Sequence, residues 1–409
     1  MFKGVSAVPT LARRFLMAKT SDGFVSLIAW VSVVGVALGV LALVVVTSVI
    51  NGFEGELIRV ITGMNGDVVL YSKGESVSGP AAIEAKIRQV VPETQAITAS
   101  LVAELMSSGP SGVAGTILEG IDPATIEKVT EVKKRVVSGR LPQGDGEIAL
   151  TYALADRLGA KEGSEIRLIA PFTGEQTKDG VSVPKVVKVQ VVGIVRMGMY
   201  EYDSKFAFAT LDSVQKFMNQ PGKVSTFKLK LDPRVDSRKA ADQLTDNFGY
   251  PFRARDWSQM NKNLFYAIRL EKVVIAIILT VIVIVAAFNV VSTLMMMIHD
   301  KTKEIAILKA MGFRATQSFQ LFCLIGMGIG AVGTGVGVAI GLGINALLQK
   351  THWIDLPAEI YYIGFLPVIV RWSEVGMIAF AALLITFAAT LYPSIRVSTR
   401  SPLDGLRHD

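Results

Sequence analysis

The stretch DKTKEIAILKAMG, residues 300–312, is short and rich in charge, and it lies between two long apolar segments. The segment before it, Val273–Ile298, has 26 residues without a charge, and the segment after it, Phe319–Leu348, has 30. An α-helix needs about 20 predominantly apolar residues to cross a hydrocarbon core of about 30 Å. Each apolar segment therefore predicts a transmembrane helix, and the charged stretch predicts a short helix between the two.

Two further apolar runs occupy the ends of the 409-residue chain, of which 51% is hydrophobic. Phe24–Ile50 has 27 residues without a charge, and Val375–Leu391 is a shorter run of the same kind. Runs of this length favour membrane spans over the buried helices of a soluble core. The first run is too long for a cleaved signal peptide and has no small-residue cleavage site after it, so we expect it to be retained.

The distribution of Lys and Arg predicts the orientation of the spans. Basic residues crowd the N-terminal segment, the charged loop and the C-terminal tail, whereas Lys350 and Arg371 in the loop before the last span are balanced by Asp355 and Glu359. Because cytoplasmic loops carry the excess of basic residues, both termini and the charged loop are expected in the cytoplasm. The net charge of +7 is then a topology signal and does not indicate nucleic-acid binding.

The fold class predicted is therefore a membrane α-helical protein with four transmembrane helices and a large periplasmic α+β domain. The predicted segments are a cytoplasmic N-terminal segment 1–23, a first span 24–50, a periplasmic domain 51–265, a stalk and second span 266–298, a cytoplasmic coupling helix 299–317, a third span 318–349, a periplasmic loop 350–373, a fourth span 374–392 and a cytoplasmic tail 393–409.

Alternating and helical patterns predict the α+β character of the outer domain. Residues with period two indicate strands, and apolar residues at helical spacing indicate helices. The strand patterns are GDVVLYS near Val68, EIRLIAP near Ile166, VVKVQVVGIV from Val186 and VSTFKLKL from Val224. The helical patterns begin at Ala81, Leu150 and Asp236, the last with Asp236 as a candidate cap.

The outer domain lacks the residues of common catalytic sites. Its sequence contains no His and no Cys, since the three histidines are His299, His352 and His408 and the one cysteine is Cys323. Ser-His-Asp and Cys-His arrangements and the usual zinc ligand sets are therefore excluded there. A carboxylate site around Glu119 and Asp122 in LEGIDP stays open beside the more ordinary interpretation as a turn. The domain is predicted to bind partners or transmit force.

One connection in this domain, APFTGEQTKDGVSVPK at residues 170–185, is longer than ordinary hairpin loops. It joins two predicted strands and contains Pro171 and Pro184. A protruding arm that engages a partner and an ordinary surface hairpin are both compatible with this sequence.

The spans carry neither a nucleotide motif nor an ion pathway. Gly328, Gly330 and Gly333 match G-x-G-x-x-G, but they lie within an apolar run, where glycines favour close helix packing. The chain has no Walker A motif, and the apolar runs hold no Asp, Glu, Lys or Arg. Asn289 and Asn345 are expected to make hydrogen bonds between helices. No cofactor is expected on this chain, so a partner must supply energy.

The charged stretch has the signals of a short amphipathic helix. Asp300 or Thr302 can cap it, Glu304 lies in its first turn and Gly312 can end it. Its apolar residues at one helical spacing are Ile305, Leu308 and Met311. Such a helix can lie flat on lipid or dock into a cytoplasmic motor.

The whole layout resembles the MacB/FtsX-type permeases of ABC transporters, and within them the lipoprotein-releasing permeases LolC and LolE of Gram-negative bacteria. The motifs that carry the resemblance are SLIAWVSVVGVALGVLALVVVTSVINGFEGEL with Asn51, Gly52, Phe53 and Glu54, AAFNVVSTL at 286–294, EIAILKAMG at 304–312, LYPSIRVSTRSPLDGLR at the C-terminal end, and LEGIDP and MYEYDSKFAFATL in the outer domain.

The resemblance implies a multi-pass protein of the bacterial inner membrane that extracts triacylated lipoproteins and hands them to a periplasmic carrier. It implies a second permease subunit and a cytoplasmic ATPase dimer that binds the ATP and Mg. The implied ATPase-coupling residues are Lys303, Glu304, Ile305, Ala306, Ile307 and Leu308. The implied carrier-binding loop includes Pro171, Phe172, Thr173, Gly174 and Pro184, and the implied lipoprotein cavity includes Tyr361, Tyr362 and Phe365.

Several alternatives stay open at the level of sequence. The loop at 171–184 is LolC-like whereas 358–370 is LolE-like, so the chain can serve as either subunit or as both in a homodimer. The other candidates are a MacB-type efflux or peptide exporter, whose ATPase would be on the same chain, an FtsX-like mechanotransmission subunit, and a membrane-anchored scaffold or receptor.

Overall fold

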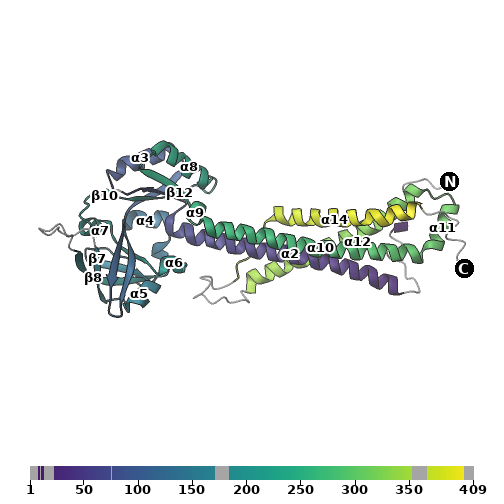
Figure 1. The fold of residues 1–409 in the computed structure, drawn as a ribbon, viewed down its shortest axis with the longest axis horizontal. Helices are drawn as coiled ribbons and strands as arrows, with labels where there is room; N and C mark the ends of the chain where they lie inside the picture. Colours follow the sequence, from purple (N-terminus) through teal and green to yellow (C-terminus); the bar gives the residue numbers. More distant parts are fainter. Residues whose placement is uncertain are drawn as a thin grey trace. The chain divides into compact units, whose positions relative to one another are not determined.

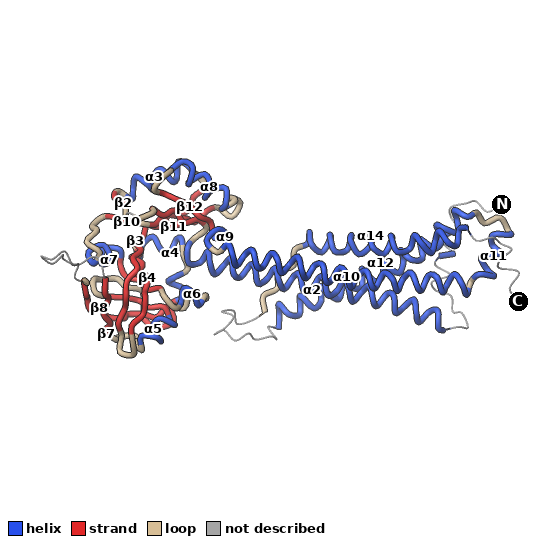
Figure 2. Tube along the Cα trace, in the orientation of Figure 1, coloured by secondary structure: helices blue, strands red, loops and turns tan. Residues whose placement is uncertain are grey.

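The computed structural model describes residues 8–9, 11–12, 23–74, 76–170, 184–351 and 366–399, with side chains of the first long helix described from residue 29. The chain divides into two compact units (Figures 1 and 2). Within the described residues, the helical unit comprises 8–9, 11–12, 23–55, 267–351 and 366–399, and the sheet unit comprises 56–74, 76–170 and 184–266.

Four long helices dominate the helical unit. They are α2 (Gly23–Asn65), α10 (Lys262–Asp300), α12 (Ala315–Thr351) and α14 (Trp372–Thr399), with the short helix α11 (Thr302–Ala310) between α10 and α12. All four are long and apolar enough to cross a membrane, which confirms the predicted helices. Their bounds extend beyond the apolar runs, because backbone hydrogen bonds inside a helix are made equally well in lipid and in water.

Hydrogen bonds between helices identify which ends lie together. Ser32 on α2 shares a 2.7 Å hydrogen bond with Thr293 on α10, and Asn345 on α12 donates to the hydroxyl of Ser48 on α2 at 2.9 Å. The prediction for Asn345 is therefore confirmed, whereas Asn289 is exposed on α10. Since early α2 meets late α10, these two helices run antiparallel, whereas late α2 meets late α12, so α2 and α12 run parallel.

Glycines on α12 bring its backbone close to two neighbours. A Cβ on Gly330 would stand 2.5 Å from Cγ2 of Thr386 on α14, and a Cβ on Gly337 would stand 2.5 Å from the carbonyl oxygen of Ala37 on α2. The glycine-rich run is therefore a packing surface, as predicted, and the dinucleotide interpretation is excluded.

The sheet unit is built on a ten-stranded sheet in the order β12-β1-β11-β3-β4-β9-β6-β8-β5, with β7 pairing with β3 and β8, and a separate β2–β10 pair (Figure 2). The strands are β1 (Val68–Ser72), β2 (Val77–Ser78), β3 (Thr94–Ser108), β4 (Val113–Ile121), β5 (Val136–Gly139), β6 (Glu147–Thr151), β7 (Glu165–Ala170), β8 (Lys185–Val195), β9 (Phe206–Thr210), β10 (Lys223–Val224), β11 (Thr226–Leu231) and β12 (Phe252–Asp256).

Short helices cover the sheet and divide its core into three apolar clusters. They are α3 (Pro80–Val90), α4 (Pro123–Val129), the 3₁₀ turn Val132–Arg135, α5 (Tyr152–Leu158), α6 (Tyr200–Asp203), α7 (Leu211–Phe217), α8 (Ser237–Phe248) and α9 (Trp257–Met260). Helices α3 and α8 contribute to the core beside β1 and β11, and α5 and α7 to the core beside β4 and β6. The α+β prediction is confirmed, and Asp236 caps α8 by accepting from two backbone N–H groups.

Gly337 and Gly335 provide a matched test of close helix packing. We expect Gly337→Ala to lower the free energy of unfolding by about 1–3 kcal/mol, because the added methyl would press on the Ala37 carbonyl. Gly335→Ala should be neutral or slightly stabilising, since nothing lies within 4 Å of its Cβ and alanine is the better helix former. Thermal unfolding of the purified protein in detergent measures both, and equal unfolding temperatures would refute the close approach of α12 and α2.

Candidate functional site

Helix α11 starts differently from the sequence prediction. Its N-cap residue is Lys301, which makes no side-chain capping hydrogen bond. Thr302 instead donates its hydroxyl backwards, to the carbonyls of Ile298 at 2.8 Å and His299 at 2.7 Å. The predicted cap at Asp300 or Thr302 is therefore wrong, because the threonine hydroxyl satisfies the end of α10. At the other end Gly312 follows with φ of +96°, a conformation that glycine adopts without strain.

The two faces of α11 divide the predicted coupling residues. Ile305 and Ala306 are buried against the helical unit, and Leu308 is half-buried. Lys303 and Glu304 are exposed, as is Ile307, at 52%. The expected apolar row of Ile305, Leu308 and Met311 is therefore divided, since Met311 is 62% exposed. The outward face of α11 consists of Lys303, Glu304, Ile307 and Met311, and this set is called the coupling face below.

Lys309 connects α11 to the end of α14. Its ammonium donates to the carbonyls of Val397 at 2.8 Å and Ser398 at 3.3 Å. A cation near a helix C-terminus is favoured by the carbonyl dipoles there, whereas partial burial lowers the pKa of Lys309. The sequence did not predict this contact, because a lysine in this loop indicates only that the loop is cytoplasmic.

A polar cluster joins three helices at the other end of the bundle. Lys272 on α10 donates to Asn51 at 2.9 Å and to Glu54 at 2.6 Å, both on α2. Arg371 lies 3.3 Å from Glu54 and 3.5 Å from Glu374 at the start of α14, and Asn51 also donates to Glu374. These five residues, Asn51, Glu54, Lys272, Arg371 and Glu374, are called the polar cluster.

The segment before α14 packs tightly on α2 beside the polar cluster. A Cβ on Gly52 would stand 2.0 Å from the carbonyl oxygen of Pro367, and a Cβ on Gly55 would stand 2.6 Å from Ile369. The backbone N–H of Ile369 donates to the Ser48 carbonyl at 3.0 Å. The NGFEG sequence thus supplies two glycines for close approach and two polar residues for the cluster. The sequence alone did not reveal their partners, which lie more than 200 positions away.

In the sheet unit, the possible carboxylate site at 119–122 has structural roles. Glu119, on β4, is buried with Lys228 on β11, and the ammonium lies 2.7 Å from one carboxylate oxygen. Asp122 caps α4, accepting from the Ala124 N–H and the Thr125 hydroxyl at 3.0 Å each. Since the two carboxylates serve different partners, they do not form the paired site that acid–base chemistry requires.

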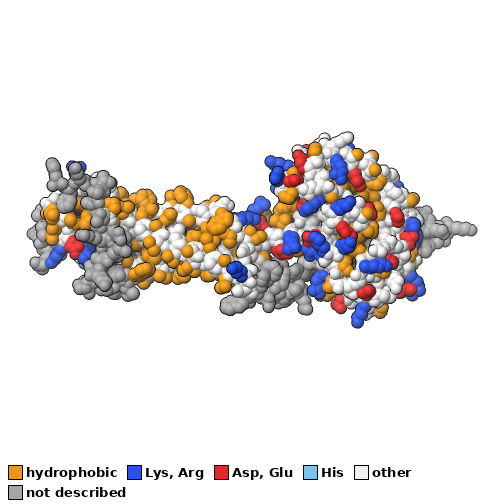
Figure 3. Space-filling model, turned by 180° about the vertical axis from the view of Figure 1, so that it is seen from behind, with side chains coloured by type: hydrophobic (Ala, Val, Ile, Leu, Met, Phe, Trp, Pro, Cys, Tyr) orange, Lys and Arg blue, Asp and Glu red, His pale blue; other side chains and the backbone are white. Residues whose placement is uncertain are grey.

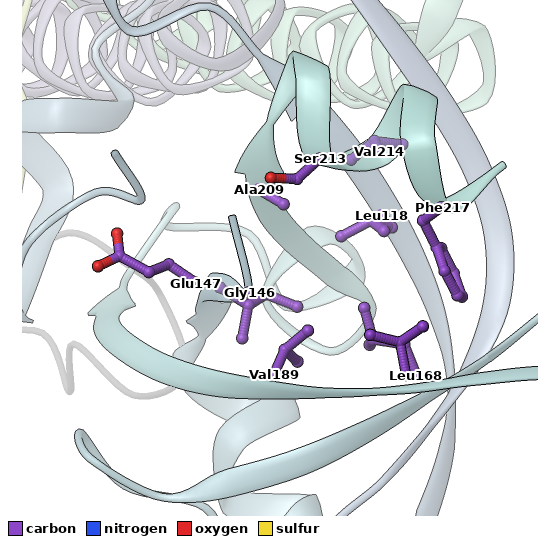
Figure 4. Close-up of a pocket in the computed structure, with 11 residues that line it drawn as sticks. Leu118, Gly146, Glu147, Leu168, Val189, Ala209, Ser213, Val214 and Phe217 are labelled. Carbon is purple, nitrogen blue, oxygen red and sulfur yellow. The ribbon is translucent and has the colours of Figure 1, made fainter. Parts of the chain in front are cut away.

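A small apolar cavity of about 60 Å³ lies between β4, β7, β8 and α7 (Figure 4). Leu118, Leu168, Val189 and Phe217 point into it, while the carboxylate of Glu147 points away (Figure 4). That carboxylate accepts from Arg140 and from the backbone N–H of Gln143, which lowers the pKa of Glu147 to about 2. The cavity has room for a small apolar group, and the hydroxyl of Ser213, which also lines it, donates to Asp145 at 2.7 Å.

The remaining predicted site residues have unequal support. Strands β7 and β8 pair antiparallel up to Ala170 opposite Lys185, so the 170–185 connection does link adjacent strands, and Pro184 directly precedes β8. The other residues of the predicted carrier-binding loop, Pro171, Phe172, Thr173 and Gly174, lie outside the described residues, as do the predicted cavity residues Tyr361, Tyr362 and Phe365.

Two family models match the chain. The family described as MacB-like periplasmic core domain matches residues 29–247, and the family described as FtsX-like permease C-terminal matches residues 276–402. Together the matches cover most of the long helices and most of the sheet unit.

Curated relatives align over nearly the whole chain. A lipoprotein-releasing system transmembrane protein LolC of Neisseria meningitidis is 33% identical, covering 97% of this chain and 98% of the relative. A LolE protein of Haemophilus influenzae is 27% identical, covering 96% and 97%. The crystal structure of the periplasmic region of MacB from Actinobacillus actinomycetemcomitans covers 51% of this chain at 12% identity and a TM-score of 0.35, too low to carry an argument.

The buried Glu119–Lys228 pair predicts a large cost for losing one partner. Glu119→Gln should lower the free energy of unfolding by about 3–5 kcal/mol, because the Lys228 charge stays buried without its counter-ion. The control is Glu165→Gln, which breaks the exposed pair with Lys188 and should cost less than about 1 kcal/mol. Thermal unfolding of the purified variants compares the two, and similar costs would show that the buried pair is not structural.

Proposed function

The chain belongs to the LolC/LolE family of MacB- and FtsX-type permeases, and we propose that it is the permease subunit of a lipoprotein-releasing ABC transporter. In this role it extracts lipoproteins from the outer leaflet of the bacterial inner membrane and passes them to a periplasmic carrier. The observation that supports it most is the alignment with LolC over 97% of the chain. Members of this family are transporter components, and ATP hydrolysis is assigned to a separate subunit.

The energetics of lipid extraction fit a permease with partners. Moving acyl chain into water costs about 0.8 kcal/mol per methylene. A chain of about 15 methylenes therefore costs about 12 kcal/mol, and three such chains about three times as much. Extraction of a triacylated protein thus requires an apolar path, an external energy source and an acceptor.

The coupling face of α11 is the proposed ATPase contact. It combines the charges of Lys303 and Glu304 with the exposed apolar side chains of Ile307 and Met311. Ile305 and Ala306 hold α11 against the helical unit, and Lys309 ties it to the carbonyls that end α14. A force applied to the coupling face therefore acts on α11 as a whole, because α11 is held by its buried side chains and by the contact of Lys309 with α14. This role places α11 and both termini on the cytoplasmic side.

The polar cluster is the proposed point where the movement of one span is passed to others. It ties α2 to α10 and α14 through side chains that are partly exposed and held by charge-assisted hydrogen bonds. Asn51 and Glu54 lie on successive turns of α2 without a break between them, so a displacement at Glu54 moves the neighbouring turns of the helical unit.

The carrier-binding role of the loop from Pro171 to Pro184, and the lipoprotein-contacting role of Tyr361, Tyr362 and Phe365, are part of the same proposal. A second permease, identical or homologous, completes the assembly. Purification of the detergent-solubilised complex from native membranes, with identification of every co-purifying protein, distinguishes a homodimer from a LolC–LolE heterodimer.

Ile307→Asp should remove the ATPase from the purified complex while the fold is retained. The substitution places a charge in the apolar centre of the coupling face without disturbing a buried contact. The matched control is Thr316→Asp, which adds the same charge at an exposed position near the start of α12. Co-purification measured by mass spectrometry, with the unfolding temperature as the check on folding, gives the result. Undiminished ATPase with Ile307→Asp would overturn the coupling role.

A crosslink across the polar cluster should stop lipoprotein release. Cysteines at positions 54 and 272, joined by a short bifunctional maleimide, would fix α2 to α10 where Lys272 and Glu54 now form an ion pair 2.6 Å long. Release to the carrier from membrane vesicles should fall to background after crosslinking, below the level that the same variant keeps without the reagent after losing its ion pair. Unchanged release in the crosslinked protein would show that the helices do not separate there.

A further inference from the structure

An apolar groove of about 300 Å³ lies between α10 and α14 on the helical unit. Hydrophobic side chains cover much of this unit's surface (Figure 3). The groove is lined by three alanines and by larger side chains, and Tyr392 is the lining residue nearest the C-terminal end of α14. The lining residues are Ile284, Ala287, Phe288, Val291, Ile385, Ala388, Ala389 and Tyr392.

The groove occupies a defined depth along the span. Trp372 and Tyr392, both exposed on α14, are 20 positions apart, which corresponds to about 30 Å at 1.5 Å per residue. This matches the thickness of a hydrocarbon core, and Trp and Tyr are enriched at its two interfaces. From Tyr392 to Ile385 the groove extends about 10 Å inward. It therefore begins at the level of the headgroups and ends within the same leaflet.

Helices α10 and α14, which form the groove, run parallel to each other. Lys272 on α10 and Glu374 on α14 meet in the polar cluster through Asn51, so both helices start at that end and run parallel. Val291 and Tyr392 follow those residues by similar numbers of positions and lie at similar depth. An occupant therefore has its apolar part toward the polar cluster and its polar end toward Tyr392.

The headgroup end of the groove carries the positive charge of an arginine. Arg396, one turn beyond Tyr392, is exposed and lies 3.5 Å from the Tyr392 hydroxyl. Among the described residues it has no acidic partner. A guanidinium and a hydroxyl together match the oxygens of a phosphate, and basic pockets beside spans bind anionic lipid headgroups.

We propose that this groove is a binding site for an anionic phospholipid of the leaflet that faces the Arg396 end. One acyl chain fills the groove between α10 and α14, and the phosphate binds Arg396 and the Tyr392 hydroxyl. This lipid is distinct from the transported lipoprotein, and its site is on the outside of the helix pair. Its effect is to hold α14 against α10, close to the carbonyls that bind Lys309 of α11.

The test uses the full chain, purified with its complex in detergent, with phosphatidylglycerol as the probe and phosphatidylethanolamine as the competitor. Native mass spectrometry counts the lipids that each variant retains. Wild-type protein should retain phosphatidylglycerol in preference, and Arg396→Gln should reduce that preference about fivefold, the effect of one basic residue at a membrane surface. The control is Arg314→Gln, which removes an exposed charge beside α12 and away from the groove.

A second pair of variants tests the groove itself. Ala388→Phe fills the groove and should abolish retention of the lipid, whereas Phe387→Trp, which adds bulk at an exposed position on another face of α14, should leave it unchanged. The unfolding temperature shows that each variant is folded. If Arg396→Gln and Arg314→Gln lowered the preference for phosphatidylglycerol equally, the preference would come from the overall positive charge of the protein, and the proposed site would be wrong. Retention unaffected by Ala388→Phe, or a partner helix or lipoprotein acyl chain crosslinking to position 388, would also overturn it.

Discussion

The helical unit depends on the close approach of α12 to two neighbours. Helices in lipid gain nothing from hiding apolar surface from one another, so they associate through van der Waals contact and hydrogen bonds. Helix α12 meets this constraint with glycine on two faces, Gly326 and Gly330 against threonines of α14, and Gly333 and Gly337 against backbone carbonyls of α2. Side chains at these positions would separate the helices, and the hydrogen bonds at their ends would then lose their geometry.

Charged contacts are confined to the ends of this glycine-packed core. A charge at the bilayer centre is costly, so the polar cluster and the Lys309 contact lie where the helices approach water. Exposed ion pairs contribute only about 0–1 kcal/mol each, whereas overpacking the glycine contacts costs more. The end contacts are thus the ones that a modest input of energy can break. This arrangement suits a transport cycle in which helix ends move and the centre of the bundle stays packed.

The sequence predicted the elements of this protein better than their contacts. Uncharged runs of 26–30 residues are typical of transmembrane helices, so the long helices were predictable. The faces of α11 were not, because Ile305, Ala306, Ile307 and Leu308 are consecutive apolar residues and the docking of the helix decides which are buried. The capping prediction failed because the Thr302 hydroxyl had an alternative acceptor in the preceding helix. The partners of Asn51 and Glu119 are far away in the sequence, so no local pattern could indicate them.

The end of α2 shows why the apolar pattern and the helix differ in length. The predicted span ends at Ile50, yet the helix continues to Asn65 and stops where Gly66 adopts φ of +71°. The last carbonyls of a helix have no partner within it, and here the ammonium of Lys228 donates to the Met64 carbonyl at 3.2 Å. The same ammonium neutralises Glu119. The buried ion pair therefore stabilises two structures at once, the centre of the sheet and the terminus of the helix that enters it. This anchor keeps the last turn of α2 from fraying, because the carbonyl of Met64 has a partner outside the helix.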